Sequence, residues 1–154
     1  MMIIAELSIE DCIDLRHEVL WPDLPRDESR VPGDDVGRHF GIVRDGAVIS
    51  CLSVFCDGED RVQIRKFATR QQLQGQGTGT LLLKEVLSKL QQEGVRSVFL
   101  DARLTAVPFY LRTGFITEGN PFIRKEVTFI RMVNKLSDVN ETPDTPLNRG
   151  TEQS

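Results

Sequence analysis

The sequence lacks the features that mark a membrane-spanning or exported protein. It contains no apolar run of about 18 residues, so no transmembrane helix is expected. Its first residues, Met1 to Glu6, have neither the basic start nor the long apolar stretch of a signal peptide. We therefore expect a cytoplasmic protein that does not bind a membrane.

Cysteine and histidine are scarce, which argues against a disulfide framework and a structural metal. The three cysteines, Cys12, Cys51 and Cys56, are odd in number and include no CxxC pair. We expect them to be buried apolar thiols. The two histidines, His17 and His39, have no nearby ligand pair at zinc spacing, so no metal site is predicted.

An excess of basic residues is also missing. The formal net charge is −4, from 19 basic and 23 acidic residues, which argues against nucleic acid as a partner. The length of 154 residues, with 40% apolar residues, suits one globular domain. Residues 137–154 are rich in Pro, Asp, Glu, Asn, Thr and Ser, so we predict a single domain over 1–136 and a disordered acidic tail over 137–154.

The most informative stretch is residues 62–94, which reads as a strand, a glycine-rich loop and a helix. By the period of two, one face of the strand carries Val62, Ile64 and Lys66, and the opposite face carries Gln63, Arg65 and Phe67. After the glycines, apolar residues at helical spacing form one wide face: Leu82, Leu83, Val86, Leu87 and Leu90. Gly94 is a stop signal for this helix.

Three glycines at a helix start need an explanation, because glycine weakens a helix by about 1 kcal/mol relative to alanine. One explanation is anion binding by the unpaired N–H groups of the first turn. The other is a tight turn with close packing. The spacing Gly75-x-Gly77-x-Gly79 matches neither the dinucleotide fingerprint nor the nucleoside-triphosphate loop.

The run Gln74-Gly-Gln-Gly-Thr-Gly79 resembles the acetyl-coenzyme A loop of the GCN5-related N-acetyltransferase (GNAT) superfamily. The small apolar tripeptide that this family often has before the loop is matched by residues 67–69, and its later Ala, Phe-Tyr and Gly-Phe pattern by Ala106, Phe109-Tyr110 and Gly114-Phe115. The resemblance spans residues 62–115. It implies an acetyl-CoA-dependent N-acetyltransferase that acts on a primary amine of a small molecule or peptide. Members are often dimers, so a homodimer is also implied.

The resemblance implies roles for particular residues. The residues that would bind acetyl-CoA, through loop amides around the pyrophosphate and a strand edge along the pantetheine arm, are Phe67, Ala68, Thr69, Gln74, Gly75, Gln76, Gly77, Thr78, Gly79 and Thr80. Tyr110, the sole tyrosine, is the implied acid that protonates the departing thiolate, since a phenol has a pKa near 10. The alternative for Tyr110 is a packed aromatic side chain.

The sequence departs from the family at several positions. Arg103 replaces an Asn that contacts pantetheine in some relatives, and no histidine follows near the last strand. No general base is evident, although Asp101, Glu118 and Glu126 are candidates. These departures keep open the alternative of a non-catalytic acyl-CoA-binding or regulatory module.

Two sets of residues are candidates for the acceptor site. In this family the region after the first strand often forms a wall of that site, and here it includes Arg16, Trp21 and Arg30; the alternative is an ordinary surface loop. A positive patch that would suit an acidic acceptor or the coenzyme 3′-phosphate, or would simply be a solvated face, comprises Arg65, Lys66, Arg103, Arg112, Arg124 and Lys125.

The remaining pattern predicts the architecture. The expected strands are 2–7, 39–43, 47–55, 62–69, 97–102, 115–117 and 127–133, and the expected helices begin at Ser8 and span 78–92 and 106–113. A strand–helix–strand crossover makes 97–102 parallel to the strand before the loop. The fold class is therefore α/β (α+β). The resemblance implies a GNAT-type mixed, mostly antiparallel central sheet with a parallel splayed pair and flanking helices.

Overall fold

The computed structural model describes residues 1–136. In chain order the elements are β1 (Met2–Leu7), α1 (Ile9–Leu20), η1 (Arg26–Ser29), β2 (Arg38–Arg44), β3 (Ala47–Cys56), β4 (Arg61–Thr69), η2 (Gln71–Leu73), α2 (Thr78–Gln92), β5 (Ser97–Arg103), η3 (Leu104–Ala106), α3 (Val107–Arg112), β6 (Ile116–Arg124) and β7 (Val127–Lys135). The predicted acidic tail, 137–154, lies outside the described residues. No helix within 1–136 is long and apolar enough to cross a membrane.

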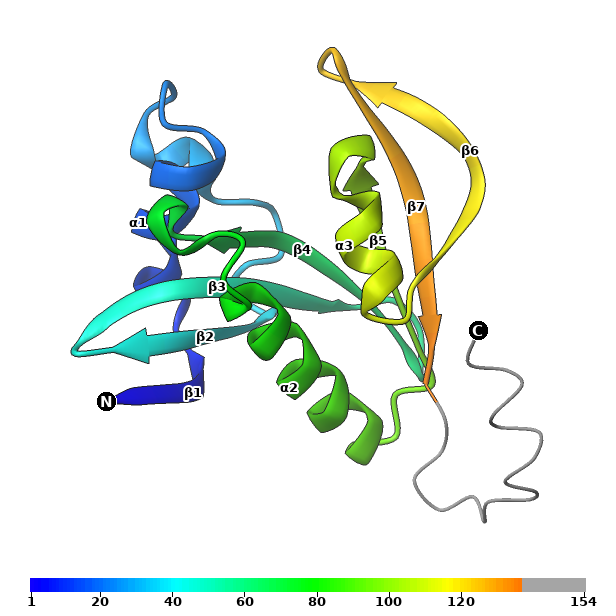
Figure 1. Ribbon diagram of the computed structural model, residues 1–154, viewed down its shortest axis with the longest axis horizontal. Helices are drawn as coiled ribbons and strands as arrows, with labels where there is room; N and C mark the ends of the chain where they lie inside the picture. The colour runs from blue at the N-terminus through cyan, green and yellow to red at the C-terminus, as the bar shows by residue number, and fades with distance from the viewer. Residues whose placement is uncertain (137–154) are drawn as a thin grey trace.

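The strands form one seven-stranded sheet in the order β1-β2-β3-β4-β5-β7-β6 (Figure 1). Every neighbouring pair is antiparallel except β4 and β5, which are parallel. This arrangement confirms the predicted mixed, mostly antiparallel sheet. The crossover from β4 to β5 runs through α2, as a parallel pair requires.

The parallel pair opens along its length. Ladder pairing joins Arg61 to Ser97, Val62 to Val98 and Gln63 to Phe99, and it ends there. From Ile64 to Thr69, the edge of β4 that faces β5 therefore has no ladder partner, which confirms the splayed pair. The opening lies in the middle of the sheet, between the loop after α1 and the tip of the β6–β7 hairpin (Figure 1).

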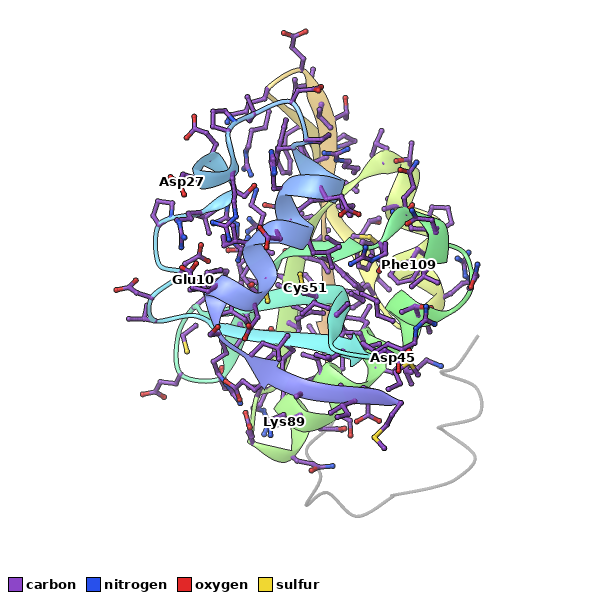
Figure 2. The ribbon with its side chains drawn as sticks, turned by 90° about the vertical axis from the view of Figure 1, so that its left-hand side faces the viewer. Glu10, Asp27, Asp45, Cys51, Lys89 and Phe109 are labelled. Carbon is purple, nitrogen blue, oxygen red and sulfur yellow. The ribbon has the colours of Figure 1, made fainter. Side chains whose placement is uncertain are left out.

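The helices cover opposite faces of the sheet. Ser8 caps α1 through a capping box with Asp11, as its sequence predicts. The apolar face of α2 packs into the main core together with residues of β2 to β5 and β7. On the other face, α1 packs through Cys12 and Leu15 against Cys51 and Ala68; Cys51 is labelled near the centre of the molecule in Figure 2. Two cysteines are thus buried as expected, but Cys56 is exposed.

A β-bulge in β4 overturns the predicted alternation of its side chains. Between the pairs Cys51–Ala68 and Ser53–Arg65, one residue of β3, Leu52, lies opposite two residues of β4, Lys66 and Phe67. Lys66 is the extra residue of the bulge, and its backbone is left-handed (φ 57°). As a result Phe67 packs against the same core as Ile64, and not on the opposite face as predicted.

The β6 strand is much longer than the predicted segment 115–117. It runs from Ile116 to Arg124 and pairs with β7, with a register shift between Glu118 and Phe122. The strand signal is hidden because Gly119, Asn120 and Pro121 interrupt the apolar pattern and because the strand is mostly exposed. The hairpin closes through Lys125 and Glu126, both at positive φ.

Candidate functional site

A cleft of about 670 Å³ lies at the opening between β4 and β5. The lining residues on the α2 and α3 side include Phe67, Thr69, Gln74, Gly75, Gly77, Gly79, Thr80, Ala106, Phe109 and Tyr110. The lining also includes Val19, Leu20 and Trp21 from the end of α1, together with Arg65, Lys66, Asp101, Arg103 and Phe129. The cleft therefore has walls that belong to both faces of the sheet.

The glycine loop forms the end of the cleft at the start of α2. Gly75 (φ 79°) and Gly77 (φ 88°) both have left-handed backbones, and a Cβ at either position would meet no atom within 4 Å. No side chain caps α2, and its first backbone bond runs from Leu81 N to Gly77 O at 3.0 Å. The N–H groups of the first turn, at Thr78 to Thr80, therefore point out of the helix without a helical acceptor. Together with the open space at the glycines, they fit an anionic group such as a diphosphate.

The end of β4 lies directly beside this loop. The Nε2 of Gln74 donates to the carbonyl oxygen of Thr69 at 2.9 Å, which ties the loop to the strand. A Cβ on Gly79 would lie 3.2 Å from Oγ1 of Thr69, so glycine permits this close approach of helix and strand. Two of the predicted residues, Gln76 and Thr78, do not line the cleft; Gln76 instead donates to the Gln72 carbonyl.

Tyr110 lies among aromatic rings in the wall of the cleft. Its ring centroid is 5.1 Å from that of Phe109, 5.6 Å from that of Phe115 and 6.4 Å from that of Phe67. Burial raises the pKa of the phenol above its ordinary value. The hydroxyl therefore keeps its proton over the whole physiological pH range.

The α1 side of the cleft is rich in cations. Arg65 and Lys66 line it beside Trp21, and Lys125 approaches from the hairpin with its Nζ 5.9 Å from the centroid of the Trp21 ring. Burial, reinforced by neighbouring positive charges, lowers the pKa of Lys66. The sequence indicated all four of these residues, Trp21, Arg65, Lys66 and Lys125. It did not predict the bulge that brings Lys66 into the cleft.

The three carboxylates considered as general bases differ in their positions. Asp101 lines the cleft, but it accepts hydrogen bonds from Arg131 (3.0 and 3.4 Å), and Arg124 lies 3.9 Å away. Glu118 and Glu126 are exposed and do not line the cleft. The cleft also has lining residues that the sequence did not single out, among them Phe129 and Leu100.

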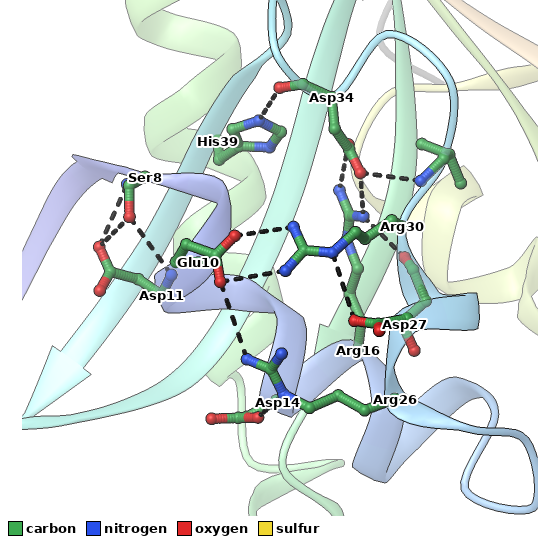
Figure 3. Close-up of polar contacts among 12 residues, drawn as sticks. Ser8, Glu10, Asp11, Asp14, Arg16, Arg26, Asp27, Arg30, Asp34 and His39 are labelled. Atoms are coloured by element: carbon green, nitrogen blue, oxygen red, sulfur yellow. Dashed lines mark hydrogen bonds and ion pairs between the residues drawn. The ribbon is translucent and has the colours of Figure 1, made fainter.

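Arg16 and Arg30 do not line the cleft, contrary to the expectation for an acceptor wall. Both instead contact carboxylates, Arg16 that of Asp34 and Arg30 that of Glu10 (Figure 3). Arg16 is 1% exposed and donates to both carboxylate oxygens of Asp34 at 2.9 Å and to Oγ of Ser53 at 2.8 Å. Arg30 pairs with Glu10 on the surface. A sequence pattern of a helix followed by a long loop does not indicate that Asp34 lies against Arg16.

The buried pair predicts a large effect on stability. Burial alone would raise the pKa of Asp34, but hydrogen bonds from Arg16 and the Val31 amide outweigh it and hold the pKa below its ordinary value. We expect Asp34→Ala to lower the free energy of unfolding by roughly 3 kcal/mol in urea titrations, because Arg16 then stays buried without its partner.

The control is Asp14→Ala, which removes an exposed partner of Arg26 and should cost less than about 1 kcal/mol. The contribution of Asp34 is present above its unfolded pKa of about 4 and is lost as the pH falls through its lower folded pKa. The cost of Asp34→Ala should therefore shrink in strong acid. A cost below about 1 kcal/mol at neutral pH would contradict this account.

The comparisons with known proteins agree on one protein family. The family model described as "Acetyltransferase (GNAT) domain" matches residues 33–136. An uncharacterized N-acetyltransferase of Bacillus subtilis (strain 168), YitI, is 27% identical over 130 residues, which cover 79% of this chain and 87% of that protein.

Two solved structures illustrate the similarity of fold. The ribosomal-protein-S18-alanine N-acetyltransferase from Escherichia coli has a TM-score of 0.73 at 17% identity, over 94% of this chain and 100% of that one. A GNAT family acetyltransferase from Elizabethkingia anophelis, solved with acetyl-CoA bound, has a TM-score of 0.70 at 16% identity, over 88% of this chain and 98% of that one.

Proposed function

Since this chain belongs to the GNAT acetyltransferase family, we propose that it transfers an acetyl group from acetyl-CoA to a primary amine of a small molecule or peptide. Membership of the family confirms the resemblance found in the sequence. The observation that carries the proposal is one cleft that joins an uncapped helix N-terminus, an unpaired strand edge and a half-buried phenol.

The donor would bind on the α2 side of the sheet. The free amides of Thr78 to Thr80 and the open backbone at Gly75 and Gly77 suit the diphosphate of acetyl-CoA. The edge of β4 at residues 67–69 would pair with the amides of the pantetheine arm as a strand is added to a sheet. The acetyl-CoA bound to the Elizabethkingia anophelis protein supports this choice of donor.

The acetyl group would pass directly from the sulfur of the donor to the nitrogen of the acceptor. The amine nitrogen attacks the carbonyl carbon of the thioester, a carbon–nitrogen bond forms and the carbon–sulfur bond breaks. Tyr110 gives its proton to the departing thiolate, the amide nitrogen loses a proton to water, and Tyr110 regains one from solvent. The products are an N-acetylated amine and free coenzyme A.

A thiol-release assay with a panel of amines tests the proposal. Acetyl-CoA should stabilise the protein against thermal unfolding, and at least one amine should yield free thiol together with an acetylated product detected by mass spectrometry. If acetyl-CoA binds and no amine in a broad panel releases thiol, the protein is the alternative, a non-catalytic acyl-CoA-binding module. The pairing of Asp101 with Arg131, which leaves no free carboxylate among the described residues that line the cleft, is the observation that favours this alternative.

Other expectations belong to the same proposal. Residues 1–136 would act as one acetyltransferase domain in the cytoplasm, either alone or as a homodimer. Size-exclusion chromatography with light scattering measures the oligomeric state directly.

A further inference from the structure

Two cations in the cleft have no acidic partner. Within residues 1–136, neither Arg65 nor Lys66 forms an ion pair, and Arg65 lies over the ring of Phe55 with 5.9 Å between its Cζ and the ring centroid. On the same face of the sheet Arg16 is paired with Asp34 and Arg131 with Asp101, whereas Arg103, which also lines the cleft, forms no ion pair within residues 1–136. Among residues 1–136, Asp101 is the single carboxylate in the cleft lining, and Arg131 already neutralises it.

The backbone directs Lys66 into this position at a cost. Its φ of 57° lies in the left-handed region, which disfavours any residue other than glycine. The side chain is half-buried in the wall of the cleft, next to Arg65. An ammonium group taken out of water among like charges is destabilised unless an anion offsets it. Burial, followed by the neighbouring cations, lowers the pKa of Lys66.

The missing anion is not the diphosphate of the proposed donor. Arg65 is the cross-strand neighbour of Ser53, which contacts Arg16 on the α1 face of the sheet. The glycine loop begins α2, which covers the opposite face. A diphosphate at the start of α2 would therefore lie on the other side of β4 from Arg65, on the donor side of the cleft.

We propose that the acceptor is an amine that also carries a carboxylate, and that Arg65 and Lys66 bind this carboxylate on the α1 side of the cleft. This inference rests on the proposed acetyl transfer and names the class of its substrate. Trp21, from the end of α1, supplies an apolar wall for the carbon skeleton between the two charged ends. The amine of the same molecule would point through the opening between β4 and β5, towards the thioester.

Matched pairs of amines test the proposal. A set of α-amino acids and short peptides is offered as free acids and as C-terminal amides, with saturating acetyl-CoA and at fixed ionic strength. We expect KM to be at least about tenfold lower for the better free acids than for their amides. Lys66→Met and Arg65→Gln should each raise KM for the acids about tenfold and leave KM for the amides unchanged.

Two further variants separate charge from structure. Lys66→Arg keeps the positive charge and should keep the preference for acids. Lys84→Met removes an exposed lysine of α2 outside the cleft and should change neither KM. Equal KM values for acids and amides in the parent protein, or an equal rise for both in Lys66→Met, would overturn the proposal.

A binding measurement keeps this test independent of turnover. Thermal shift is recorded in the presence of coenzyme A, with each free acid and with its amide. A larger shift for the acids that disappears in Lys66→Met supports the carboxylate site even if no amine is acetylated, in which case the proposed acetyl transfer alone has failed. Equal shifts for acid and amide count against the carboxylate site.

Discussion

Replacing Gly77 by aspartate is expected to weaken the binding of acetyl-CoA about 100-fold. Gly77 is the N-cap residue of α2, has a left-handed backbone and faces open space. A carboxylate at this point would lie where the diphosphate should bind, and two like charges about 4 Å apart repel by roughly 1–4 kcal/mol near a protein surface. A factor of 100 corresponds to about 2.7 kcal/mol. Isothermal titration calorimetry at fixed ionic strength measures the change in Kd.

Gly94→Asp is the matched control for this variant. Gly94 follows the other end of α2, has nearly the same φ (95°) and also faces open space. The two variants carry the same added charge and a similar backbone strain of about 1–2 kcal/mol, so their thermal stabilities should fall alike. Only Gly77→Asp should lose acetyl-CoA. If the folded Gly77→Asp protein binds acetyl-CoA as the parent does, the diphosphate does not lie at this helix.

Tyr110→Phe is expected to lower the rate of acetyl transfer about 100-fold and to leave the affinity for acetyl-CoA unchanged. The substitution removes the proton donor, and acid catalysis of this kind contributes roughly 10²–10⁴-fold. The ring itself should stay in place, because it packs against Phe67, Phe109 and Phe115. Single-turnover kinetics measure the chemical step without interference from product release.

The raised pKa of Tyr110 adds a second observable to this test. An ordinary phenol loses its proton near pH 10, whereas burial keeps that of Tyr110 bound at higher pH. The single-turnover rate of the parent should therefore not decline through pH 10 from loss of the acid. If Tyr110→Phe transfers the acetyl group as fast as the parent protein, Tyr110 is a packing residue and the thiolate leaves without its help.

The features that follow local rules could be predicted from the sequence. The capping box at Ser8 and the apolar face of α2 depend on residues three or four positions apart, and both are present. The positions of the glycine loop and of Tyr110 came from motif spacing, and the cleft brings most of these residues together. The parallel direction of β5 followed from the crossover rule alone.

The features that the sequence could not provide depend on contacts between distant residues. The bulge at Lys66 results from the register of β4 against β3, and no residue type in this stretch marks it. Arg16 has the same charge as the cations that line the cleft, Arg65 and Lys66. Its burial depends on the ion pair with Asp34, which lies in a loop without regular structure. The length of β6 depends on pairing with β7, which compensates for its glycine and proline.

The opening between β4 and β5 has a kinetic consequence. Because the cleft has lining residues from both faces of the sheet, donor and acceptor can bind at the same time, and a ternary complex can assemble. Initial-rate measurements that vary both concentrations should then give intersecting double-reciprocal lines. Transfer through a covalent acetyl-enzyme intermediate would instead give parallel lines.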